Sequence, residues 1–141
     1  MDELLIEKLD NCVLESLKND EIPVGAVIFD KNNKIISFGI NNRQKENNIL
    51  GHAEINAILM AEKEINDWRL DGYSMLVNLE PCNMCSIIIK ESRLDKIYYF
   101  LPNKNEIVTT KLNKEQLTGE EHTKRSEKYK DILSTYFKNK R

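Results

Sequence analysis

The spacing of apolar residues predicts the first helix and the first two strands. Near the N-terminus, apolar residues recur at helical spacing between charged ones, at Leu5, Leu9, Val13 and Leu17. Residues 3–19 are therefore predicted to form an amphipathic helix. Next come the β-rich runs VGAVIFD and KIISFGI, which are separated by turn-forming residues. This pattern predicts a β-hairpin over residues 24–40.

The middle of the chain alternates between helical and strand patterns. After a polar loop at 41–51, residues 52–65 are rich in helix formers and apolar over most of their face, as in a helix buried against a sheet. Further along, the predicted elements are a buried strand at 74–79, a helix opened by Pro81 at 81–92, and a strand at 95–100. This alternation is typical of an α/β fold in which helical crossovers join parallel strands.

The C-terminal third has a weaker pattern. Residues 102–124 are polar without a clear period, so we expect them to be mostly loop and leave open a short edge strand at 107–110. Residues 125–141 are predicted to form a basic C-terminal helix. The apolar side of that helix would carry Tyr129, Ile132, Leu133, Tyr136 and Phe137. A chain of 141 residues can bury one substantial core, and we expect a single domain over residues 1–141.

The composition excludes a membrane-spanning chain and gives no sign of export. Hydrophobic residues make up 40% and charged residues 31% of the chain, and no apolar run approaches the roughly 18 to 20 residues of a membrane span. The acidic N-terminus lacks the features of a secretory signal, so we expect a cytoplasmic protein. The net charge is only −2, but residues 102–141 carry 10 basic and 6 acidic side chains. An anionic partner is therefore expected to meet this C-terminal part.

Two short motifs carry the candidate chemistry. His52 and Glu54 form an H-x-E motif at a predicted helix start, and Cys82 and Cys85 form a C-x-x-C motif directly after Pro81. Cysteines three apart on a helix share a face, so both thiolates can reach one ion, and His52 would complete three protein ligands. A three-ligand zinc site keeps a fourth position for water, whose pKa the ion lowers to about 7 from about 15.7. Glu54, next to that water, would then be the candidate carrier of protons.

Each motif alone has a simpler interpretation. A C-x-x-C motif is often a redox pair or half of a structural zinc site, and a lone histidine is more often an ordinary polar residue than a ligand. A structural zinc site would need a fourth ligand, and Cys12 and His122 are the only spare cysteine and histidine. Neither lies in a ligand motif. The combination of motifs therefore favours a catalytic zinc site.

The combined pattern resembles the H-x-E and P-C-x-x-C signature of the zinc deaminases. A longer resemblance runs from residue 21 to about residue 100 and returns in the last helix. The segments EIPVGAVIFD, GHAEINAI, WRLDGYSMLVNLEPCNMC and ILSTYFKNKR are similar to the bacterial tRNA-specific adenosine deaminases of the cytidine/deoxycytidylate deaminase superfamily. This resemblance implies a three-layer, cytidine-deaminase-like α/β fold with a central mixed sheet of about five strands flanked by helices. It also implies one Zn²⁺ per chain, a homodimer and a tRNA anticodon stem-loop as partner.

The resemblance also implies roles for individual residues. Asn41 would hydrogen-bond the target base, Val24 and the backbone around Ala53 would line its pocket, and Glu54 would move protons. In the last helix, the residues that match RNA contacts of the family are Tyr136, Phe137 and the basic end from Lys138 to Arg141. Core packing of the two aromatic residues and a solvated basic helix end are the simpler alternatives.

The chain departs from the family after the strand at 95–100. The family usually has an Asp and a Lys in this stretch that contact the ribose and phosphates, whereas Asn103 stands where that Asp would be. An amide can still hydrogen-bond a 2′-hydroxyl, but without the charge-assisted strength of a carboxylate. The short and divergent segment 102–124 therefore favours a smaller substrate.

The sequence as a whole predicts zinc-dependent hydrolytic deamination of adenosine to inosine at the wobble position of a tRNA anticodon. The main alternative is a deaminase of free nucleobases or nucleosides, such as cytosine or guanine, built on the same zinc site. A non-catalytic, zinc-stabilised RNA-binding subunit is a further alternative. The carboxylate of Glu54 argues against this last alternative, because a purely structural zinc site moves no protons.

Overall fold

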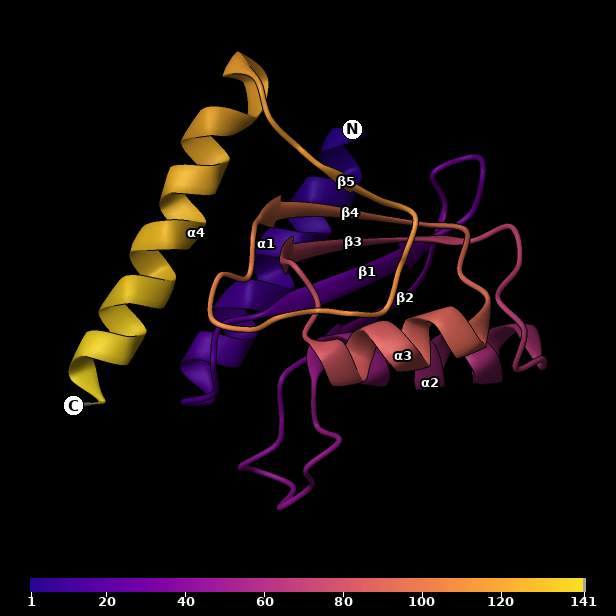
Figure 1. Cartoon of the computed structure of the whole chain (residues 1–141), viewed down its shortest axis with the longest axis horizontal. Coiled ribbons are helices and arrows are strands. Elements are labelled where there is room, and N and C mark those ends of the chain that lie inside the picture. Colours follow the sequence, from indigo (N-terminus) through magenta and orange to yellow (C-terminus); the bar gives the residue numbers. More distant parts are fainter. Residues whose placement is uncertain (141) are drawn as a thin grey trace.

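One five-stranded sheet with helices on both faces forms the framework of the protein (Figure 1). A computed structural model describes residues 1–140. In chain order its elements are α1 (Glu3–Lys18), β1 (Gly25–Phe29), β2 (Ile35–Ile40), α2 (Ala53–Ile65), β3 (Ser74–Leu79), α3 (Asn83–Ser92), β4 (Lys96–Leu101), β5 (Lys114–Gln116) and α4 (Glu120–Asn139). No helix within this described part is both long enough and apolar enough to cross a membrane.

The sheet is mixed, with the strand order β2-β1-β3-β4-β5. β1 runs antiparallel to both β2 and β3, whereas β3, β4 and β5 run parallel. The predicted hairpin is therefore confirmed, and α3 is the helical crossover that joins the parallel strands β3 and β4. β3 ends at Leu79, so the turn that follows it brings Cys82 to the edge of the sheet where parallel strands end.

Alternate residues of the central strands face two separate apolar layers. Ala26 and Ile28 of β1 pack in one cluster with residues of α2 and α3, while Val27 and Phe29 pack in another with residues of α1 and with Tyr129 of α4. Successive side chains of a strand point to opposite faces of a sheet, so this alternation places one helical layer on each face. Figure 1 shows α2 and α3 together on one side of the sheet and α1 on the other. The predicted three-layer α/β fold is confirmed.

The edge strand lies later in the chain than the sequence suggested. Residues 107–110, which lie within the described part, form no strand. Ile107 is 87% exposed, and the Thr109 N–H donates to the side chain of Asn83 instead of to a strand. β5 takes the edge position instead, and Leu117 directly after it is buried. The three residues of β5 are all polar, so the spacing of apolar residues could not predict this strand.

The last helix begins earlier than predicted. α4 starts at Glu120 rather than at residue 125. Glu120 and Glu121 lie in its first turn, where carboxylates suit the positive end of the helix dipole. His122 in the same turn is buried with its ring edge-on to Phe100, 5.7 Å between ring centroids. This first turn is too polar for a hydrophobic pattern to reveal.

A polar network fixes α4 against α1. The Tyr129 hydroxyl donates to Asp10 Oδ1 at 2.5 Å, and the Arg125 guanidinium forms an ion pair with the other oxygen of the same carboxylate. Tyr129 is otherwise buried in the apolar cluster of α1, and burial raises its pKa, so the hydroxyl stays protonated and remains a donor. The network sets the position of α4, which forms one wall of the cavity described below.

We expect Tyr129→Phe to lower the free energy of unfolding by about 1–3 kcal/mol, because the half-buried carboxylate of Asp10 loses one of its donors. Tyr136→Phe is the matched control, since the Tyr136 hydroxyl lies 3.4 Å from the carbonyl oxygen of Asp20 and its loss should cost less. Urea denaturation of both variants measures the difference. Equal losses would show that the Tyr129–Asp10 contact does not anchor α4.

Candidate metal centre

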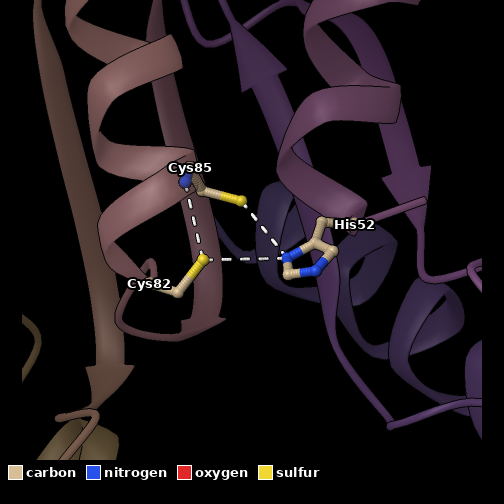
Figure 2. Close-up of side chains that lie close together, drawn as sticks. All are labelled: His52, Cys82 and Cys85. Carbon is tan, nitrogen blue, oxygen red and sulfur yellow. Dashed lines mark hydrogen bonds between the residues drawn. The ribbon is translucent and has the colours of Figure 1, made fainter. Parts of the chain in front are cut away.

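Three side chains from the starts of two helices converge on one point (Figure 2). His52 is the N-cap residue of α2, Cys82 is the N-cap residue of α3, and Cys85 lies in the first turn of α3. The His52 Nδ1 atom is 3.8 Å from Cys82 Sγ and 3.4 Å from Cys85 Sγ. All three potential ligand atoms lie within 4.8 Å of one another. The ligand set expected from the sequence is therefore brought together.

These distances fit a tetrahedral zinc ion. Zinc binds imidazole nitrogen at about 2.0–2.1 Å and thiolate sulfur at about 2.3 Å, so tetrahedral geometry separates the nitrogen from each sulfur by about 3.6 Å. The two observed separations, 3.8 and 3.4 Å, lie on either side of that value. Among residues 1–140, the cluster contains no fourth His, Cys, Asp or Glu ligand. This arrangement leaves room for water, as in catalytic zinc sites, whereas structural sites are closed by four protein ligands.

The start of α3 differs in detail from the sequence prediction. Pro81 precedes the N-cap instead of occupying the first helical position, and Cys82 is extended rather than helical. The reason is that Cys82 Sγ itself accepts the Cys85 N–H at 3.5 Å, a capping role that only the residue before the helix can play. The two sulfurs therefore meet through a capping turn, not through a shared helical face. Pro81 has no backbone N–H, but it lies before the helix, so no hydrogen bond of α3 is lost.

Protonation states in the cluster differ between the two cysteines. A hydrogen bond from Cys85 and a second one from His52 lower the pKa of Cys82 to about 4, against the effect of burial. The first of these hydrogen bonds, together with burial, raises the pKa of Cys85. The hydrogen bond to Cys82 also raises the pKa of His52. Cys82 is therefore a thiolate at neutral pH. A bound cation would also favour loss of the thiol proton of Cys85, because metals coordinate the thiolate form.

Glu54 is buried beside this cluster. Only 5% of its surface is exposed, and burial raises its pKa to about 7. Its position in the first turn of α2, two residues after His52, agrees with the placement expected from the H-x-E motif. A carboxyl group with this pKa can both accept and release a proton near neutral pH.

A cavity of about 590 Å³ opens onto the cluster. Its floor includes His52, Glu54 and Cys82, and its walls come from Val24 just before β1, from the end of β4 and the residues up to Glu106, and from α4. Pockets of about 300–1,000 Å³ are typical of small-molecule sites. Of the four sequence-predicted pocket residues, Val24, Asn41 and Asn103 line this cavity.

Asn41 and Ala53 are joined by a hydrogen bond at the cavity edge. The Asn41 Oδ1 atom accepts the Ala53 N–H at 2.8 Å, and its amide nitrogen donates to the carbonyl oxygen of Ile22 at 2.9 Å. Ala53 is fully buried, and its N–H is the group that the Asn41 side chain holds. The two contacts fix the Asn41 amide in one orientation beside His52.

The predicted RNA contacts of α4 point in different directions. Phe137 is 46% exposed and lines the cavity, whereas Tyr136 is buried and faces the turn at Asp20. Lys138 is exposed. Arg141, the last residue of that set, lies outside the described residues. The RNA roles of these side chains remain predictions.

Several residues around the cavity had no sequence signal. Glu80 and Glu106 line it, and Glu80 forms an ion pair with Lys114 at 2.7 Å. A single charged residue in a polar loop has no periodic pattern, so only the fold shows that it faces the site. Cys12 and His122, the two spare ligand candidates, lie outside the metal cluster. Cys12 is buried on α1, where burial raises its pKa to about 11.

The family described as "Cytidine and deoxycytidylate deaminase zinc-binding region" matches residues 1–101. Among curated proteins, the chain is 34% identical over 131 residues to the tRNA-specific adenosine deaminase of Buchnera aphidicola subsp. Schizaphis graminum, covering 88% of this chain and 85% of the relative. It is 47% identical over 85 residues to the tRNA-specific adenosine deaminase of Rickettsia bellii, covering 60% of this chain. The alignment covers only 59% of that relative, and 56% and 55% of those from Rickettsia felis and Rickettsia typhi.

Solved structures show the same fold. A structure from work on A-to-I editing by tRNA:A34 deaminases superposes with a TM-score of 0.71 at 30% identity, covering 74% of this chain and 79% of the other. A guanine deaminase from Nitrosomonas europaea superposes with a TM-score of 0.80 at 17% identity, covering 96% and 84%, and this likeness concerns the fold alone. Zinc is accordingly the metal that His52, Cys82 and Cys85 are arranged to hold. Because the family match over residues 1–101 includes that entire ligand set, the chain belongs to the deaminase family of the cytidine and deoxycytidylate deaminase zinc-binding region.

Proposed function

We propose that this protein converts adenosine to inosine at the wobble position of a tRNA anticodon by hydrolytic deamination. The observation that carries the proposal is the buried Glu54 carboxyl group beside three convergent zinc ligands at the floor of one cavity. The tRNA-specific adenosine deaminases of Buchnera and Rickettsia, and the tRNA:A34 deaminase structure, support this substrate in particular. The reaction consumes water and releases ammonia.

Glu54 and Asn41 have separate roles in the proposed reaction. Bound zinc supplies an acidified water at neutral pH. Glu54 would take a proton from the attacking water and deliver it to the ring nitrogen, then take the second proton from the newly added hydroxyl group and deliver it to the departing amine, so the carboxyl group ends in its starting state. The pKa of about 7 suits this role because both protonation states are populated near neutral pH. The Asn41 amide is fixed by its contacts to Ile22 and Ala53, and its remaining N–H and oxygen lone pair would hydrogen-bond the base.

The proposal includes an RNA partner, a homodimer and a cytoplasmic location. A base held in an enclosed cavity must leave its stack, which is easiest for a loop nucleotide of an anticodon. Leu59 and Ile87 lie on α2 and α3, two helices in contact with each other, and are 52% and 48% exposed, which supports contact of this helical layer with a second copy. A sedimentation equilibrium experiment that finds only monomers at micromolar concentration would contradict the dimer.

The direct test offers the zinc-loaded protein a panel of anticodon stem-loops, free adenosine, guanine and cytosine. We expect inosine only in stem-loops with adenosine at the wobble position, with release of one ammonia per inosine. Stem-loops with guanosine at that position serve as the matched control. Ammonia from guanine or cytosine alone would instead establish the free-base alternative, and no ammonia from any substrate would favour a non-catalytic subunit.

Glu54→Gln should abolish deamination without loss of metal. We expect the turnover number to fall by at least about 10²-fold, because the variant keeps the size of the side chain but cannot move protons. Zinc measured by atomic absorption should stay near one ion per chain. Glu64→Gln, an exposed position of the same helix, is the control and should keep full activity. Zinc loss in Glu54→Gln would mean that Glu54 is a ligand.

Deletion of residues 138–141 should weaken RNA binding and flatten its dependence on salt. Each cation that contacts a phosphate contributes a slope of about −0.7 in log affinity against log salt for a single strand. Lys31→Ala is the control, because Lys31 follows the end of β1 that is remote from the cavity-lining Val24. Fluorescence anisotropy with a labelled stem-loop measures the slope. An unchanged slope would assign these charges to solvent, and to the Lys140–Asp20 ion pair.

A further inference from the structure

The segment between β4 and β5 is tied to the turn that carries the zinc ligands. At its start, the Asn103 N–H donates to Glu80 Oε1 at 3.1 Å, and Lys114 of β5 holds the other oxygen of that carboxylate at 2.7 Å. Glu80 lies two residues before Cys82. One half-buried carboxylate therefore joins the end of β3, the following segment and the edge strand.

A second tie is reciprocal and lies within the C-x-x-C motif itself. The Asn83 N–H donates to Glu106 Oε1 at 2.9 Å, and the Asn83 Oδ1 atom accepts the Thr109 N–H at 3.3 Å. Asn83 lies between the two cysteines. Residues 102–109, called the clamp segment below, are thus fastened at both ends to the residues that flank and separate the ligands.

The Glu106 contact also caps the first residue of α3. The first N–H groups of a helix have no partner inside the helix, and Asn83 is the first residue of α3. Cys82 Sγ serves the Cys85 N–H, and Glu106 serves the Asn83 N–H. A carboxylate at a helix N-terminus is also favoured by the helix dipole. If Glu106 is removed, the Asn83 N–H loses its partner, and this residue lies between the two cysteines whose sulfurs must keep their relative positions.

We propose that Glu106 and Asn83 are positioning residues that clamp the metal-binding turn, so that Cys82 and Cys85 keep the geometry that retains zinc. This inference rests on the zinc site of the proposed function. Outer partners of metal ligands orient those ligands, and their loss typically costs 10–100-fold in metal affinity or activity. The clamp segment also supplies a wall of the cavity from Pro102 to Glu106. This wall is therefore connected to the metal-binding turn by two hydrogen bonds, from the Asn103 N–H to Glu80 and from the Asn83 N–H to Glu106.

The test measures zinc release from the loaded protein to a chromogenic chelator, without substrate. We expect Glu106→Ala to release zinc about 10-fold faster than the wild type, since the turn loses its outer partner. Glu106→Gln keeps an acceptor for the Asn83 N–H and should release zinc at close to the wild-type rate. Asn83→Ala should also accelerate release, because it frees the Thr109 end of the clamp. Glu115→Ala is the control, an exposed carboxylate of β5 paired with Lys96.

Two outcomes would overturn the clamp. Release from Glu106→Ala at the rate of Glu115→Ala would show that the contact does not hold the turn. Release from Glu106→Gln as fast as from Glu106→Ala would show that the charge attracts the ion and that the hydrogen bond is irrelevant. Because the readout needs no RNA, a failed clamp and a failed substrate assignment are distinguished: the stem-loop panel reports only on the substrate.

Discussion

The convergence of one imidazole and two thiol groups at the starts of α2 and α3 is the constraint on which the rest of the site depends. The His52 Nδ1 atom lies 3.8 and 3.4 Å from the two sulfurs, which are the separations that a tetrahedral ion requires. Charging the Glu54 carboxyl group and the Cys85 thiol next to the Cys82 thiolate is costly without a cation, because burial and the neighbouring negative charge raise the pKa of both groups. Metal binding therefore stabilises an arrangement that the side chains alone would resist.

The fold makes this convergence possible by fixing the starts of both helices. The buried side chain of Asn78 on β3 accepts the Gly25 N–H and donates to the carbonyl oxygen of Pro23, each at 3.0 Å, which ties β3 to the segment before β1. Glu21 is buried, and its two carboxylate oxygens accept the N–H groups of Gln44 and Lys45 in the loop before α2. Buried polar groups that are fully hydrogen-bonded rigidify their surroundings. The cavity walls are thus positioned by polar anchors, while the apolar layers hold the helices on the sheet.

Elements that carry a repeated or local residue pattern could be predicted from the sequence. The amphipathic α1, the hairpin, and the helices that follow His52 and Pro81 were predicted because apolar spacing reports which face is buried. The ligand set was predicted from its motif. What could not be predicted lies in polar segments: β5, the first turn of α4 and the carboxylates of Glu80 and Glu106 depend on contacts between residues far apart in the chain. The capping role of Cys82 was also missed, because a motif gives the spacing of two cysteines but not the backbone conformation between them.

The most direct measurement of the central claim is zinc K-edge X-ray absorption spectroscopy on the metal-loaded protein. The spectrum should show two sulfur scatterers at about 2.3 Å and one imidazole nitrogen at about 2.0–2.1 Å, with the fourth position filled by a light atom such as the oxygen of water. A shell of four protein ligands would describe a structural site. A shell without sulfur would place the metal elsewhere. Either result would contradict the catalytic zinc site proposed at His52, Cys82 and Cys85.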